Sequence, residues 1–220
     1  MKIYVDEAGV FIPPTGRRRH SLVLALVVPT ETEPDLLYQF LRLRDSWPEQ
    51  AIEIKGSRLN EGQAAQVADL LAAHDVIAEF RGIDMQLHPS VIIDEFKERQ
   101  AVALTENLTP RHPEGIVRSL RQAAQGIRAL SNPLFVQAFL TIQLILNMLD
   151  VAINYHAQRR PSELGRFAWV IDRKGHSITQ MEQLWSTLIL PFGESWSAQR
   201  PLAIVEGFDY SHCASHQIVS

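Results

Sequence analysis

The sequence predicts an α/β fold, and three observations carry that prediction. Short apolar runs rich in β-branched residues recur along the chain, which is typical of buried strands. Segments with apolar residues at helical spacing and with helix-capping signals lie between them. A long, mainly helical stretch separates the earlier strands from the later ones. The 220 residues contain no internal repeat or clear linker, so we expect one domain, 1–220, with a helical insertion at about 89–160.

The chain opens with two predicted strands. Apolar and polar residues alternate over 2–6, and this run ends at Asp6. A loop with two prolines and a glycine follows, and the almost wholly apolar segment 21–28 then predicts a buried strand. We expect these two strands to pair as an antiparallel hairpin. Apolar spacing over 33–47 predicts a helix that Pro48 ends.

The next part of the chain combines a charged extended segment with a helix and a strand. Alternation over 51–56 puts Glu53 and Lys55 on one face of an extended segment. Asn60, with a glutamine three residues later, is a capping-box signal for a helix that runs to about residue 73. Segment 76–83 alternates enough to predict another strand.

The helical stretch covers 89–158 and is interrupted over 109–115. Its strongest helix, 133–157, is apolar on more than one face, so we expect it to be central to the core. The most apolar part, 134–153, contains two glutamines, an asparagine and an aspartate, which favours a buried helix over a membrane span.

The last third returns to alternating strands and helices. Segment 166–171 predicts a strand that ends on Asp172, and Ser177 with a glutamine three residues later is a second capping-box signal. Segment 201–205 predicts a final strand, and 206–220 is polar.

Composition narrows the classes of partner and location. A net charge of −4 gives no global attraction to nucleic acid or to an anionic membrane, so polyanion binding needs a local basic patch. The single cysteine, Cys213, excludes an internal disulfide framework and favours a reducing compartment. No secretory signal is evident, so we expect a cytoplasmic protein without membrane contact.

Three acidic residues are associated with predicted strands or extended segments, and they are candidate metal ligands. Asp6 and Asp172 each end an apolar run, and Glu53 lies beside Lys55. Carboxylates on adjacent strands can hold one or two Mg²⁺ or Mn²⁺ ions that activate water and stabilise a leaving oxygen at phosphorus. The alternative is that strand-end aspartates form turns by accepting backbone hydrogen bonds. Both interpretations remain open from these residues alone.

The order of these motifs resembles the DUF3800 family, whose members have a ribonuclease H-like fold and no assigned activity. Residues 3–9, Ile-Tyr-Val-Asp-Glu-Ala-Gly, are similar to the family opening Y-[IV]-D-E-S-G, and 53–57 resemble its E-x-K element. Segment 167–172 resembles a later strand that ends in aspartate, and the region from Asp209 to Gln217 resembles the closing motif. The resemblance covers the whole chain.

This resemblance implies a ribonuclease H-like mixed β-sheet flanked by helices, with clustered metal-binding carboxylates. Carried over residue by residue, Asp6, Glu53 and Asp172 would bind the metal, and Lys55 would lie beside them. Three further residues are candidates for supporting roles: Glu7, His176 and Asp209. Two departures bear on activity. Ala8 replaces the usual serine, and Ser220 replaces the closing aspartate, which would weaken at least one metal site.

Several other residues have weaker functional interpretations. Arg17, Arg18 and Arg19 could contact a nucleic-acid backbone, or form a solvated loop. Cys213 with its neighbouring histidines has superficial zinc-ligand spacing, but no second cluster completes a site. The sequence has no P-loop, no G-x-G-x-x-G and no G-x-S-x-G motif, which disfavours nucleotide-driven motors, dinucleotide enzymes and α/β-hydrolases.

These observations lead to two principal hypotheses. The first is a Mg²⁺- or Mn²⁺-dependent nuclease or other phosphodiester hydrolase acting on DNA or RNA, with a small-molecule phosphatase as a weaker variant. The second is a catalytically inactive interaction or regulatory module of the same fold, for instance a homodimer.

Overall fold

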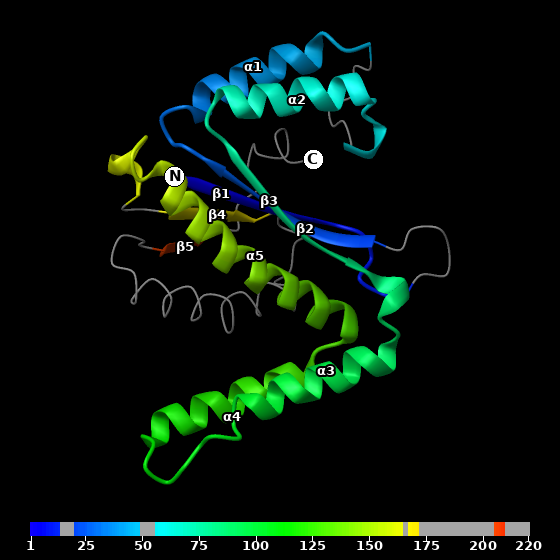
Figure 1. Cartoon of the computed structure of the whole chain (residues 1–220), viewed down its shortest axis with the longest axis vertical. Helices are drawn as coiled ribbons and strands as arrows, with labels where there is room; N and C mark the ends of the chain where they lie inside the picture. Colours follow the sequence, from blue (N-terminus) through cyan, green and yellow to red (C-terminus); the bar gives the residue numbers. More distant parts are fainter. Residues whose placement is uncertain (14–19, 49–55, 165–166, 172–204, 210–220) are drawn as a thin grey trace.

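The computed structural model of the chain describes residues 1–13, 20–48, 56–164 and 167–170, and the backbone of 171 and of 205–209. This part of the chain forms a five-stranded mixed sheet with helices on both faces, so the α/β prediction is confirmed (Figure 1). The strands are β1 (Lys2–Ala8), β2 (His20–Val28), β3 (Ile77–Asp84), β4 (Phe167–Ile171) and β5 (Val205–Asp209). The α-helices are α1 (Glu33–Asp45), α2 (Glu61–Ala73), α3 (Ser90–Ala103), α4 (Glu114–Ala129) and α5 (Asn132–His156). Three short 3-10 helices cover Gly56–Arg58, Met85–Leu87 and Pro161–Glu163.

The first strand lies at the centre of the sheet. The strand order is β3-β2-β1-β4-β5, with β2 antiparallel to β1 and β3, and with β4 parallel to β1 and β5. The predicted β1–β2 hairpin is therefore confirmed. Its register sets Val5 opposite Ala25, and on the other side of β1 the same Val5 pairs with Ile171.

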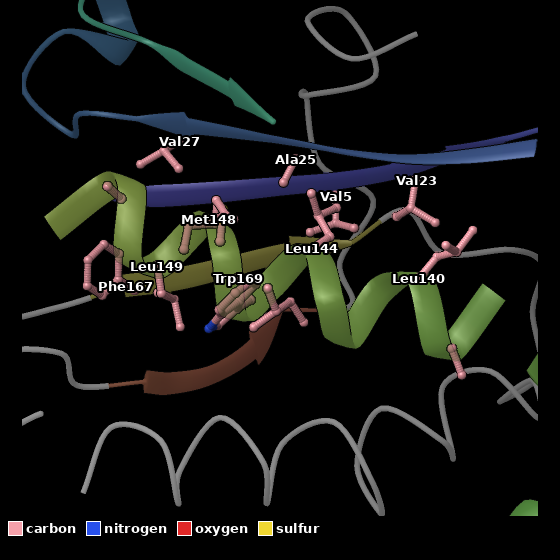
Figure 2. Packing of buried hydrophobic residues seen from close by; sticks show 14 of the residues in the cluster. Val5, Val23, Ala25, Val27, Leu140, Leu144, Met148, Leu149, Phe167 and Trp169 are labelled. Atoms are coloured by element: carbon pink, nitrogen blue, oxygen red, sulfur yellow. The ribbon is translucent and has the colours of Figure 1, made fainter. Parts of the chain in front are cut away.

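One face of the sheet packs against α5 and forms the larger core. Because side chains alternate along a strand, Ile3 and Val5 point to this face together with Val23 and Trp169. Figure 2 shows the α5 residues Leu140, Leu144, Met148 and Leu149 lying against these strand residues. The expectation that this helix is central to the core is confirmed.

The helix α5 is also the one described helix that is long and apolar enough to cross a membrane by composition. Its most apolar window has a mean hydropathy of 1.7, and half of that window is buried inside the protein. The helix contacts β2 and β3, and the buried half of its apolar window is part of the core.

The helices α1 and α2 cover the opposite face. Tyr4 and Val170 from the sheet pack there with Leu36 of α1, and with leucines of α2. The Tyr4 hydroxyl donates a hydrogen bond to the Glu33 carboxylate, which also pairs with Lys2 at 2.8 Å. These contacts fix the start of α1 to the first half of β1.

The helices α3 and α4 form a hairpin at the end of the molecule opposite α1 and α2 (Figure 1). Arg128 of α4 holds Glu98 of α3 through two hydrogen bonds of 2.9 and 2.7 Å. Lys97 donates to the carbonyl of Leu130 and to Asn132 Oδ1, so it satisfies polar groups at the turn between α4 and α5.

The capping-box prediction for α2 is confirmed in atomic detail. Asn60 Oδ1 accepts from the Gln63 backbone N–H, and Gln63 Oε1 accepts from the Asn60 N–H, both at 2.9 Å. The other end of α2 closes with Asp75 in the left-handed region at φ 56°, and with a bond from Val76 N to Leu71 O.

Two strand boundaries differ from the expectation. β1 continues past Asp6 to Ala8 because Glu7 and Ala8 still pair with β2, so Asp6 lies within the strand. The strand ends before Gly9, whose φ of +106° suits glycine. The last strand described is Val205–Asp209, so strand structure extends into the segment expected to be a polar tail. The predicted extended segment over 51–55 and the cap at Ser177 lie outside the described residues.

Candidate functional site

Asp6 is the predicted site residue that the structure describes most fully. It lies on the central strand, where β1 has β2 on one side and β4 on the other. Its backbone pairs with Leu24, and its side chain is half-buried. A carboxylate in this position is held on a backbone that is hydrogen-bonded within a sheet, which limits its movement.

Asp6 and Glu7 lie on opposite faces of the sheet. Asp6 shares the face of Tyr4, which α1 and α2 cover, whereas Glu7 shares the face of Val5 and α5. One Glu7 carboxylate oxygen is buried on the α5 side. Two carboxylates on opposite faces cannot bind one ion directly, so a metal site that included Asp6 would need its other ligands from neighbouring strands or loops.

The parallel register of β1 and β4 bears directly on the Asp6–Asp172 pair. Val5 pairs with Ile171, and these are the residues immediately before the two aspartates in the sequence. Asp209 belongs to β5, where its backbone pairs with Val170 of β4. Asp209 is therefore two strands away from β1, roughly 10 Å across the sheet.

The remaining predicted site residues lie outside the described part of the chain. They are Glu53, Lys55, Asp172 and His176, together with the arginines Arg17, Arg18 and Arg19. Within the described ranges, no three His, Cys, Asp or Glu side chains gather closely enough to hold a metal ion.

An acid–base pair that no sequence motif indicated lies at the end of the sheet where β1 ends. His20 begins β2 and pairs with Asp84 at the end of β3, with 3.7 Å between Nε2 and Oδ2. Asp84 also accepts a hydrogen bond from the Gln86 backbone N–H, which caps the following 3-10 helix. The signal available in the sequence was an aspartate directly before a short helical turn.

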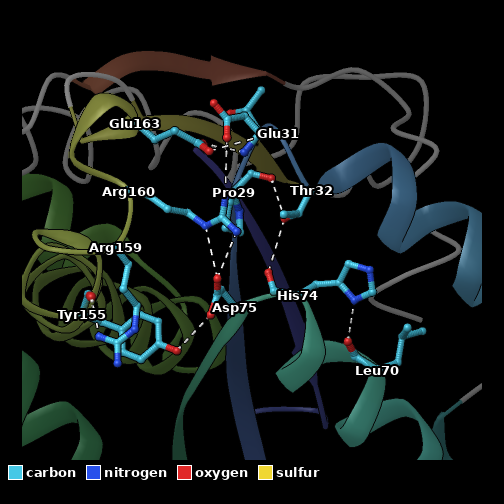
Figure 3. Close-up of polar contacts among 11 residues, drawn as sticks. Pro29, Glu31, Thr32, Leu70, His74, Asp75, Tyr155, Arg159, Arg160 and Glu163 are labelled. Atoms are coloured by element: carbon cyan, nitrogen blue, oxygen red, sulfur yellow. Dashed lines mark hydrogen bonds and ion pairs between the residues drawn. The ribbon is translucent and has the colours of Figure 1, made fainter.

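A larger polar network lies at the opposite end of the sheet, where β1 and β3 begin and α5 ends (Figure 3). Arg160 donates to Asp75 Oδ2 from Nε and Nη2 at 3.3 and 3.0 Å, and Tyr155 donates to Asp75 Oδ1 at 3.3 Å. The Arg160 hydrogen bond is the main cause that lowers the pKa of Asp75. Glu31 lies 3.5 Å from the same guanidinium.

Glu163 ties this end of the sheet to the turn after β2. Its carboxylate accepts hydrogen bonds from the backbone N–H groups of Thr30 and Glu31. Burial acts to raise the pKa of Glu163, but the Thr30 hydrogen bond and the Met1 amino group outweigh it and lower the pKa. Since the network joins chain segments at the sheet end away from Asp6, it stabilises the fold rather than a site at Asp6.

Comparison with known proteins assigns neither a family nor a function to the chain. No family model, curated protein or solved structure matches the chain.

Proposed function

We propose that this protein is a divalent-metal-dependent phosphodiester hydrolase with a ribonuclease H-like domain. The observation that carries the proposal is the pairing of Val5 with Ile171 on adjacent parallel strands. Continuing that register by one residue would bring Asp6 and Asp172 side by side on one face, with about 4.8 Å between strands. The mixed sheet with helices on both faces agrees with the architecture that the resemblance to the DUF3800 family implies.

The chemistry follows from this pair of aspartates. Asp6 and Asp172 would hold Mg²⁺ or Mn²⁺ through carboxylate oxygens, which hard divalent cations prefer. Glu53 would add a ligand or accept a proton from the attacking water, and Lys55 would contact a phosphate oxygen. The bound metal would polarise the phosphodiester and lower the pKa of the attacking water.

Calorimetric titration with Mn²⁺ tests the metal site directly. We expect binding at millimolar or lower concentration in the wild type, and loss of that binding in Asp6→Asn, which removes one carboxylate charge. Asp69→Asn is the matched control, because Asp69 is exposed on the helix α2 and belongs to no strand of the sheet. Absence of Mn²⁺ binding to the wild type, or equal binding to both variants, would overturn the metal site.

Cleavage assays on DNA, RNA and nucleoside phosphates then test the reaction. We expect phosphodiester cleavage that requires Mn²⁺ or Mg²⁺ and disappears in Asp6→Asn. Metal binding without any cleavage would instead assign the inactive interaction module. Cleavage confined to small phosphate esters would assign the phosphatase variant.

A further inference from the structure

The tip of the α3–α4 hairpin contains a solvent-open hollow of about 950 Å³. The loop before α4 and the first turns of that helix form its walls. Its polar lining consists chiefly of His112, Glu114, Arg118, Arg121, Gln122 and Gln125. These side chains come from one continuous segment, so the hollow exists without any contribution from the sheet.

Two arginines give the hollow its cationic character. Arg118 and Arg121 are exposed, and within the described residues neither forms an ion pair or a hydrogen bond. Arg128, about two turns further along α4, by contrast forms an ion pair with Glu98 at 2.7 Å. The guanidinium groups of Arg118 and Arg121 are thus available to an external anion, and Glu114 is the single acidic group in the lining.

The neutral groups in the lining add hydrogen-bond donors. In the tautomer that accepts the Thr109 backbone N–H at Nδ1, at 3.0 Å, the His112 ring carries its proton on Nε2; the same Nδ1 lies 3.3 Å from the Thr109 carbonyl oxygen. Gln122 and Gln125 lie one turn along α4 from Arg118 and Arg121, on the part of the helix that borders the hollow. Guanidinium, imidazole and amide N–H groups together match the anionic oxygens of phosphate.

The shape and position of the hollow favour a polymer over a single small anion. Arginines three residues apart on a helix present guanidinium groups about one turn apart, which suits successive phosphates of a strand. The volume also exceeds what a lone phosphate fills. In Figure 1 the hairpin lies apart from the sheet, beyond α5, so only an extended substrate could contact both this hollow and Asp6.

We propose that this hollow binds a nucleic-acid strand through its phosphates, with Arg118 and Arg121 as the principal contacts. The inference deepens the proposed function, on which it rests for naming a phosphodiester polymer as the substrate. The hairpin would hold the strand at a distance from the carboxylates and so orient it.

Fluorescence anisotropy with labelled single-stranded DNA and RNA of about 20 nucleotides tests this binding. The measurements are made in EDTA, so that binding is separated from cleavage. We expect Arg118→Gln/Arg121→Gln to bind on the order of tenfold more weakly than wild type, with the salt slope reduced by about 1.4 for two lost phosphate contacts. Circular dichroism checks that both proteins are folded.

Arg42→Gln/Arg159→Gln is the charge-matched control. Both residues are exposed, both lie over tyrosine rings, and neither borders the hollow. We expect this variant to bind nearly as tightly as wild type. Equal weakening in the two double variants, or no binding by wild type, would overturn the proposal, as would equally strong competition by polyglutamate, which would indicate an acidic protein partner.

The outcome is distinguishable from failure of the proposed hydrolase. A protein that binds nucleic acid through Arg118 and Arg121 but neither binds Mn²⁺ nor cleaves would overturn the hydrolase and support the binding site. Metal-dependent nuclease activity, with nucleic-acid binding unchanged in Arg118→Gln/Arg121→Gln, would support the hydrolase and overturn the binding site.

Discussion

Replacing His156 with phenylalanine is expected to stabilise the protein. His156 is completely buried near the end of α5, and neither ring nitrogen has a hydrogen-bond partner among the residues that the structure describes. A buried polar group without a partner costs about 1–3 kcal/mol relative to a satisfied or apolar one. A phenylalanine ring of similar size removes that cost, so we expect the free energy of unfolding to rise by about 1–3 kcal/mol and Tm by about 2–4 °C per kcal/mol.

The same histidine makes stability depend on pH. Burial is the main cause that lowers the pKa of His156 below its ordinary value of 6.5. The surrounding charges oppose one another, since Asp75 and Glu163 act to raise this pKa and Arg159 and Arg160 act to lower it. The unfolded chain therefore binds a proton before the folded protein does, and stability falls as pH decreases from 6.5 toward the lowered folded-state value. The slope in that window approaches about 1.4 kcal/mol per pH unit.

Urea unfolding of wild type and His156→Phe between pH 7.5 and pH 5 measures both effects. The stability difference between the two proteins should widen as pH decreases below 6.5, because the variant lacks the titrating group. His74→Phe is the control with the opposite sign. His74 is also buried, but its ring nitrogens bond to Leu70 O at 2.9 Å and Asp35 Oδ2 at 3.1 Å. Its replacement should destabilise, and a destabilised His156→Phe or a pH-independent difference would refute the reasoning.

Three further substitutions test the core, a turn and a cap through urea unfolding followed by circular dichroism. Leu149→Ala removes a fully buried side chain from the α5 core and should lower the free energy of unfolding by about 2–5 kcal/mol. A decrease below about 1 kcal/mol would contradict the packing. Gly9→Ala should cost at least about 2 kcal/mol, because φ is +106° and a Cβ would lie 2.6 Å from Ser21 Oγ; a neutral effect would refute this turn geometry. Asn60→Ala removes the cap on Gln63 N and should cost about 1 kcal/mol, whereas Asn60→Asp should retain most of the stability.

Local patterns predicted most elements because their causes are local. The capping box at Asn60 depends on two side chains three residues apart, and the apolar faces of α5 follow from its own sequence. The β1–β2 hairpin was likewise predictable, since its strands are adjacent in the sequence and β-rich. The helical spacing over 33–47 also located α1, which ends at Asp45.

The features that local patterns could not predict depend on distant partners. Asp75 adopts a left-handed conformation that sequence rules assign to glycine, and its side chain is held by Tyr155 of α5 and by Arg160, which follows that helix. The placement of β4 beside β1, rather than beside β3, also follows from tertiary packing. Asp6 lies within β1 because the pairing of β1 with β2 continues to Ala8, beyond the end of the apolar run. The hollow at Arg118 required the shape of the hairpin, which spacing alone does not give.

The position of β4 has a consequence for biosynthesis. β1, β2 and β3 leave the ribosome early, but the strand that completes the other side of β1 arrives only with residues 167–171. At cellular synthesis rates the interval between β2 and β4 is on the order of ten seconds. During that time β1 presents an unpaired edge of N–H and C=O groups, flanked by the apolar side chains of Ile3 and Val5. The nascent chain should therefore be a target for chaperones that shield strand edges, and its folding should be slow because the central pairing joins distant residues.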